Sequence, residues 1–215
     1  MTDLVGLVRE ALLRGAPAAL PGAEALSAYL RLVLEANEGI NLVSRKEATP
    51  GSLVGRHLLD ALEALPMLPP PGARPGRLLD IGSGGGFPAL PLLLVRRDLE
   101  GVLVESVGKK SRFLESAVRS LGLTARVVNA RFPDPALVEM RKLPPCDLLT
   151  SRAVAGAGRI VRQSIPALRR GAVALLWTSE PLLEEVRRAL PGANVVFQKS
   201  PEADRRGIAR VECFT

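Results

Sequence analysis

The hydrophobic pattern divides the chain into two parts. Before residue 68, apolar residues recur at three- and four-residue spacing in three segments, 3–14, 24–37 and about 52–65. This spacing predicts amphipathic helices. The stretch "PMLPPPGARPG" then interrupts the periodicity, because three consecutive prolines and two glycines cannot continue a helix. We therefore predict an N-terminal helical domain over 1–68, a Pro/Gly-rich linker over 69–76 and a second domain over 77–215.

In the second part, short apolar runs alternate with helical stretches. The candidate strands are 77–81, 101–105, 125–129, 146–151, 171–177, 193–198 and 207–214. Strands that alternate with helices predict an α/β fold with a doubly wound, mostly parallel sheet, here of seven strands. A polar loop, "KSPEADRRG", joins the last two strands without a helix. It predicts an antiparallel hairpin at the end of the sheet.

The first of these strands runs into a glycine-rich turn, with Asp80 followed by Gly82, Gly84 and Gly86. A dinucleotide fingerprint would place its third glycine at position 87, which is Phe87. A phosphate-binding Walker loop is excluded, because no Gly-Lys-Ser/Thr sequence follows. The spacing resembles motif I of the class I S-adenosylmethionine (SAM) methyltransferases. There, glycines let the backbone pass close to the cofactor, where a Cβ would collide. We expect Asp80 to anchor the turn through backbone amides.

Three charged residues follow the predicted strands at the same sheet edge. Glu105 ends the second strand, where a carboxylate can accept hydrogen bonds from ribose hydroxyls. Arg131 and Arg152 come at the ends of the third and fourth strands, so both are candidates to bind a cofactor carboxylate or a substrate phosphate. The alternative interpretation is that Glu105 is only a polar residue at a strand end, and that Arg131 and Arg152 are solvated surface residues.

The net charge of +7 is unevenly distributed. Residues 1–76 hold seven Lys and Arg against eight Asp and Glu, whereas residues 77–215 hold 22 against 14. The excess of positive charge in the part that contains the glycine-rich turn favours a polyanionic partner. The alternative is that these arginines are scattered over the surface and bind no partner. Lys109 and Lys110 also open a helix, where the dipole disfavours cations. The candidate substrate-binding cations are Lys109, Lys110, Arg112, Arg205 and Arg206.

The residues near this edge restrict the methyl acceptor. Cys146 precedes its strand, so it lies at the wrong edge to act as the nucleophile of a cytosine C5 methyltransferase. "TSRAVA" replaces the Asn/Asp-Pro-Pro-aromatic run of base-amine methyltransferases, and no lysine-rich tetrad typical of ribose methylation is apparent. Guanine N7 remains, an unprotonated ring acceptor that needs no general base.

Several segments together resemble the RsmG (GidB) family, the guanine-N7 methyltransferases of bacterial 16S ribosomal RNA. The likeness begins near residue 30 and is carried by "NLVSRKE", "LVGRHLLDAL", "LLDIGSGGGFPALPL", "VLVESVGKKSRFL", "VVNARFP" and "CDLLTSRAVA". The resemblance implies the class I SAM methyltransferase fold, SAM as cofactor and 16S ribosomal RNA of the small subunit as partner.

The resemblance also implies roles for individual residues. Gly82 and Phe87 contact the methyl donor, with Asp80, Gly84, Gly86 and Glu105 completing its site. Ala130, Arg131 and Phe132 frame the adenine, and Arg152 closes the site. His57 and Asp60 come from the helical domain, on one helix face. Arg131, Arg152 and His57 are the catalytic candidates. Without the resemblance, His57 is equally well explained as a buried, hydrogen-bonded histidine.

Three positions depart from the family pattern. Thr178 stands where the family carries a lysine, Ala89 replaces a common glycine and Glu105 an aspartate. Because the lysine is absent, an alternative function remains: a protein that binds the cofactor or RNA without transferring a methyl group. An NAD-type oxidoreductase is a further alternative, against which the glycine spacing argues.

The remaining features predict a cytoplasmic monomer without membrane association. No apolar run is long enough to span a bilayer, and the first 15 residues lack the features of a signal peptide. Cys146 and Cys213 show neither a disulfide pattern nor metal-ligand spacing, so we expect no metal site.

Overall fold

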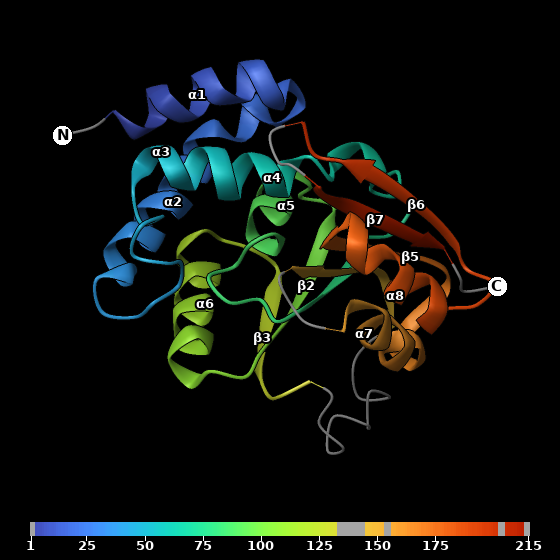
Figure 1. Cartoon of the computed structure of the whole chain (residues 1–215). Helices are drawn as coiled ribbons and strands as arrows, with labels where there is room; N and C mark the ends of the chain where they lie inside the picture. Colours follow the sequence, from blue (N-terminus) through green and yellow to red (C-terminus); the bar gives the residue numbers. More distant parts are fainter. Residues whose placement is uncertain (1–2, 133–144, 153–155, 202–204, 213–215) are drawn as a thin grey trace.

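The computed structural model describes residues 3–132, 145–152, 156–201 and 205–212 (Figure 1). A seven-stranded sheet has the order β3-β2-β1-β4-β5-β7-β6. Its strands are β1 Gly76–Ile81, β2 Leu99–Glu105, β3 Ala125–Asn129, β4 Cys146–Arg152, β5 Leu168–Ser179, β6 Asn194–Lys199 and β7 Arg206–Glu212. β1 to β5 pair in parallel, whereas β7 is antiparallel to both β5 and β6. The doubly wound, mostly parallel sheet and its final hairpin are confirmed.

Helices cover both faces of this sheet. The helices that connect its strands are α5 Ala89–Val95, α6 Gly108–Ser120, α7 Ala157–Ser164 with the short 3-10 turn η5 Ile165–Ala167, and α8 Glu180–Ala189. Successive strand residues point to opposite faces, so Leu78 packs in the cluster with α5 and α6, and Leu79 in the cluster with α7 and α8. Figure 1 shows α7 and α8 together on one side of the sheet.

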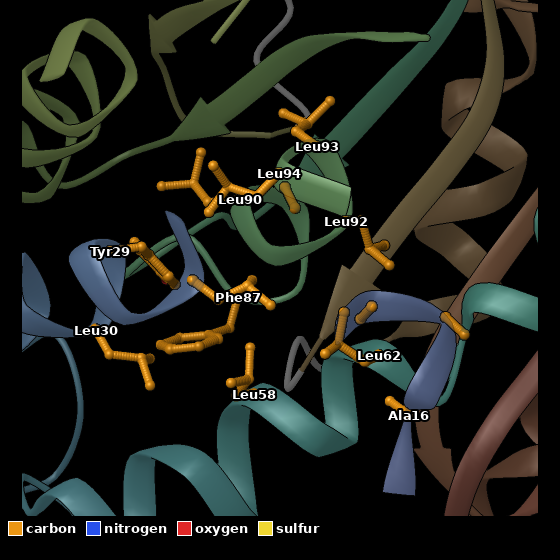
Figure 2. Close-up of a cluster of buried hydrophobic side chains, with 14 of the residues drawn as sticks. Ala16, Tyr29, Leu30, Leu58, Leu62, Phe87, Leu90, Leu92, Leu93 and Leu94 are labelled. Atoms are coloured by element: carbon orange, nitrogen blue, oxygen red, sulfur yellow. The ribbon is translucent and has the colours of Figure 1, made fainter. Parts of the chain in front are cut away.

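The chain before β1 is helical, as the periodicity predicts. Its elements are α1 Leu4–Gly15, the 3-10 turn η1 Pro17–Gly22, α2 Ala23–Asn37, α3 Pro50–Ser52, η2 Leu53–Leu59, α4 Asp60–Leu62 and the 3-10 turn η3 Leu65–Met67. Their apolar faces join the same hydrophobic cluster as Leu78 of β1 and Leu103 of β2. The helical segments therefore pack directly on the sheet, and in Figure 2 Leu30 and Leu58 lie beside Phe87, which follows the glycine-rich turn.

The third predicted helix differs from expectation. Instead of one α-helix over 52–65, the segment begins at Pro50 and its middle, η2, is a π-helix. Single π-helical turns inside α-helices often occur at functional sites. Hydrophobic periodicity cannot reveal such a turn, because an α-helix and a short π-helical segment place apolar residues at nearly the same spacing.

Across the described ranges, no helix combines the length and the apolar character needed to cross a bilayer.

Candidate functional site

The glycine-rich turn, residues 82–86, connects β1 to Phe87 and adopts a backbone that requires glycine. Gly82, Gly84 and Gly86 have φ angles of 76°, 55° and 100°, which L side chains rarely adopt. A Cβ on Gly86 would also lie 2.6 Å from Cδ1 of Leu90. The alternate glycines of the sequence thus correspond to three left-handed positions, and the turn presents backbone rather than side chains at the carboxyl edge of the sheet.

Glu105 ties the end of β2 to this turn. Its Oε2 accepts a hydrogen bond from Gly84 N at 2.8 Å, and its Oε1 accepts one from Val107 N at 2.7 Å. The residue is buried, with an exposed fraction of 6%. Each carboxylate oxygen has a second lone pair, so the group can still accept a hydrogen bond from a ligand hydroxyl.

Asp80 does not anchor the turn through backbone amides, so that expectation is wrong. Its Oδ1 instead accepts a hydrogen bond from the hydroxyl of Thr150 at 2.6 Å. The cause is register: Asp80 of β1 pairs with Thr150 of β4. The amides of Gly82 and Ser83 donate to Val104 O, at 2.9 and 3.1 Å. Burial raises the pKa of Asp80 to about 6, despite the opposing effect of the Thr150 hydroxyl.

Arg152, the last residue of β4, joins the sheet to η2. Its Nη2 donates to Arg56 O at 3.1 Å and lies 3.2 Å from His57 Nδ1, and its Nε lies 3.3 Å from Asp60 Oδ2. The structure therefore brings His57, Asp60 and Arg152 together, although about 95 residues separate them in the chain.

His57 is neutral at pH 7 in this arrangement. Burial, and then the charge of Arg152, lower its pKa from 6.5 to about 4. A guanidinium can only donate, so His57 Nδ1 accepts the hydrogen bond from Arg152 and the ring proton resides on Nε2. The ring also lies 5.2 Å from that of Phe87, centroid to centroid. His57 thus contacts both Arg152 and the end of the glycine-rich turn.

Two residues that the sequence analysis missed hold neighbouring segments in place. Trp177 of β5, the strand partner of Arg152, donates from its indole Nε1 to Asp60 O at 2.9 Å. Tyr29 of α2 donates from its hydroxyl to Gly85 O at 2.8 Å. In the sequence, both appear as ordinary apolar positions of a strand and a helix, and no local signal distinguishes them.

The residues after β3 lie on the far side of β2 from the glycine-rich turn. Ala130 N donates to Glu105 O at 3.1 Å, Arg131 is exposed and Phe132 is half-buried. The strand order places β2 and β1 between β3 and β4. The backbones of Arg131 and Arg152 are therefore roughly 14 Å apart, at about 4.8 Å per strand. The two arginines flank the turn rather than adjoin each other.

The candidate substrate cations fall into two groups. Lys109 and Arg112 are exposed and Lys110 half-buried in the first turns of α6. Arg205 and Arg206 are exposed at the start of β7, and Arg206 pairs with Ser179 at the carboxyl end of β5. Arg206 lies close enough to Asp60, the residue directly after η2, to affect its pKa. Burial raises the pKa of Asp60, and the positive charges of Arg152 and Arg206 both lower it.

Thr178, which departs from the family lysine, lies in β5 opposite Gly207 of β7. Its side chain is buried, and its Oγ1 has no hydrogen-bond partner among the described residues. The threonine itself brings no charge to this edge. Arg206 pairs with Ser179, the next residue of β5, and therefore places a positive charge at the carboxyl end of this strand.

Cys146 lies at the opposite edge of the sheet, as its place before the strand predicts. It is the first residue of β4, whereas Arg152 is the last. Burial raises the pKa of its thiol to about 11. A thiol in this state and place cannot serve as a nucleophile for chemistry at the glycine-rich turn.

The sequence of this chain is similar to those of known proteins. Residues 22–198 match the family GidB, rRNA small subunit methyltransferase G. The "Ribosomal RNA small subunit methyltransferase G" of Acidiphilium cryptum is 35% identical over 86% of this chain and 81% of its own length. The protein of the same name from Alkalilimnicola ehrlichii is 38% identical over 79% and 71%.

A solved structure supports the fold. The precorrin-6y C5,15-methyltransferase of Geobacter metallireducens GS-15 superposes with a TM-score of 0.57 at 15% identity, covering 79% of this chain and 91% of that one. Together with the strand order, this confirms the class I SAM-dependent methyltransferase fold. The resemblance found in the sequence is confirmed as well: the chain belongs to the GidB family, rRNA small subunit methyltransferase G.

Proposed function

We propose that this protein transfers a methyl group from SAM to N7 of a guanine in 16S ribosomal RNA of the small ribosomal subunit. One observation carries the proposal: a glycine-rich turn with a buried carboxylate, Glu105, and the cluster of Arg152, His57 and Asp60 share one sheet edge in a chain of this family. The first suits a nucleoside cofactor and the second an RNA acceptor.

The residues at the turn fit a SAM molecule. The glycines leave room for the methionine part to approach the backbone, and Glu105 offers lone pairs to the ribose hydroxyls. We assign the donor contacts to Gly82 and Phe87, and the adenine side to Ala130–Phe132. When bound, SAM supplies an electrophilic methyl group on a sulfonium.

The protein groups near this edge suit an acceptor that needs no general base. Guanine N7 carries a lone pair and no proton, so positioning and exclusion of water are sufficient. His57 is neutral at pH 7, and Asp80 accepts the Thr150 hydrogen bond. We propose that Arg152 and His57 position the guanine, with Arg131 on the other side of the turn.

The cations around this edge are proposed to bind the RNA backbone. They are Lys109, Lys110 and Arg112 on α6, and Arg205 and Arg206 at the start of β7. RNA affinity then falls steeply with salt, because each phosphate contact releases counterions. We further propose that the protein acts as a cytoplasmic monomer.

The decisive experiment measures methyl transfer from labelled SAM to small ribosomal subunits isolated from a strain that lacks the enzyme. We expect incorporation into 16S RNA and recovery of the label as 7-methylguanosine. Label in another nucleoside would contradict the guanine-N7 assignment. Measurable SAM binding without any incorporation would instead support a binding protein that has lost the activity.

A further inference from the structure

The two halves of the glycine-rich turn are held by different parts of the molecule. The first half is bonded to β2: Gly82 N and Ser83 N donate to Val104 O, and Gly84 N donates to Glu105. The second half is bonded to α2, through the hydrogen bond of 2.8 Å from Tyr29 Oη to Gly85 O. The conformation of the turn next to Phe87 therefore depends on a side chain from the helical segments.

Tyr29 is itself rigidly placed. Its exposed fraction is 0%, and its ring lies 5.1 Å from that of Phe87, centroid to centroid. Figure 2 shows the two rings side by side, with Leu30 and Leu58 around Phe87. Burial raises the pKa of Tyr29 well above 10, so the hydroxyl keeps its proton and remains a donor at any physiological pH.

Beside the bond within the turn from Gly86 N to Ser83 O, of 2.7 Å, the Tyr29 hydroxyl supplies the second half of the turn with a bond from the helical segments. Gly85 is buried, so bulk water does not readily replace a lost partner at its carbonyl. At Gly86, a Cβ would lie 3.0 Å from Tyr29 Oη, which shows how closely the hydroxyl approaches the backbone. Without this donor, the buried carbonyl of Gly85 loses its bond, and the backbone leading to Phe87 loses its polar attachment to α2.

We infer that Tyr29 is a positioning residue for the methyl donor: through Gly85 O it fixes the part of the turn that precedes Phe87. This inference rests on the proposed function, since it assumes that SAM binds at the turn. Tyr29 does not touch the reacting atoms. Its effect is on the affinity for SAM and not on the transfer step.

The test is Tyr29→Phe, which removes the hydroxyl and keeps the ring. Ser27→Ala is the matched control, because Ser27 is a buried residue of the same helix whose hydroxyl donates within α2, to Ala23 O at 2.6 Å. For Tyr29→Phe we expect an increase of about tenfold in the Kd and KM for SAM, with kcat unchanged within about twofold. Ser27→Ala should leave all three values at those of the wild type.

A purely structural role would lower the unfolding temperature of both variants and leave the SAM Kd of both unchanged. That result overturns the inference, as does an equal rise of the Kd in both variants. Wild-type protein that binds no SAM would overturn the proposed function and this inference with it. Wild-type binding that Tyr29→Phe leaves unchanged overturns the inference alone.

A second measurement needs no variant. The chain contains one tyrosine, so 3-fluorotyrosine labels Tyr29 alone and gives a single fluorine resonance. Titration with SAM should shift this resonance, with a midpoint at the Kd measured by calorimetry, and NAD should leave it in place. A resonance that does not move at saturating SAM would contradict a link between Tyr29 and the donor site.

Discussion

The two sides of the site are built in different ways. The donor side, defined as the glycine-rich turn with Glu105, is held mainly by hydrogen bonds from the turn to β2, with one further bond from Tyr29 of α2. The acceptor side, defined as η2 with Arg152 and Trp177, is held by side chains that reach across 95 to 117 residues of sequence. The acceptor side therefore depends on how the helical segments pack on the sheet.

The two sides also differ in how their polar atoms are satisfied. Both oxygens of Glu105 accept backbone hydrogen bonds. On the acceptor side and beside it, Arg152 Nη1 and Thr178 Oγ1 are buried without a hydrogen-bond partner within the described part of the chain. Buried polar atoms without partners are costly. Glu105 is thus fixed by the backbone and keeps further lone pairs for a ligand, whereas the acceptor side carries polar atoms that the described part of the chain leaves without a hydrogen bond.

The largest effect is expected for Arg152→Ala. The change removes the contacts with Arg56 O, His57 and Asp60, and so releases η2 from β4. We expect methyl transfer to small subunits to fall by about a hundredfold, the loss typical of an acceptor misplaced by about 1 Å. The control is Arg169→Ala, which breaks an ion pair with Asp147 at the amino edge. Equal losses in both variants would show that the acceptor side has no special role.

On the donor side, Glu105→Gln should weaken SAM binding by about tenfold to a hundredfold. The amide group cannot accept hydrogen bonds from both Gly84 N and Val107 N. Glu100→Gln is the matched control at the other end of β2, where Glu100 pairs with Arg77. Calorimetry with SAM measures both. An unchanged Kd for Glu105→Gln would remove the carboxylate from the donor side.

Trp177→Phe tests the acceptor side more finely. It removes the hydrogen bond to Asp60 O and keeps an aromatic ring. Because one hydrogen bond contributes about 1 kcal/mol, we expect kcat/KM for the RNA to fall roughly fivefold. The SAM Kd should remain that of the wild type. A weaker SAM affinity would mean that the two sides are not separable.

The smallest expected change in activity concerns Asp80, which lies between the two sides. Its folded-state pKa of about 6 exceeds the ordinary 3.8, so the stability it contributes is present below pH 3.8 and is lost as pH rises through 6. Asp80→Asn does not ionise. The free energy of unfolding of this variant, relative to wild type, should therefore increase by about 1–3 kcal/mol from pH 4 to pH 7. Denaturant titrations across this range measure it, and a flat difference would contradict the raised pKa.

The same contrast separates what the sequence could predict from what it could not. The alternate glycines, Glu105 and the mostly parallel sheet with its final hairpin are local in the sequence or follow from the alternation of strands and helices, and each was predicted. The role expected for Asp80 was wrong, because it depended on the register between β1 and β4. The π-helical turn, Tyr29 and Trp177 were missed, because tertiary contacts give them their roles.

The family motifs bridged part of this gap. Arg56, His57 and Asp60 look unremarkable as a helical segment, and the resemblance alone assigned His57 and Asp60 to the site. The structure supplies a physical reason, since both side chains meet Arg152. The division into domains at 1–68, 69–76 and 77–215 stays a prediction.

The reversed direction of β7 has a consequence for engineering. In a parallel sheet each strand is entered from the amino edge, but β7 begins at the carboxyl edge, where Arg206 pairs with Ser179. The start of β7 therefore lies beside the carboxyl end of β5. The described residues on either side of the connection from β6 to β7 hold neighbouring segments: Ser200 Oγ donates to Glu63 Oε1 at 2.7 Å, and Arg205 O accepts from Glu180 N at 2.9 Å. A library confined to Arg205 and Arg206, both exposed at this edge, is expected to change the affinity for RNA and to leave the SAM Kd at that of the wild type.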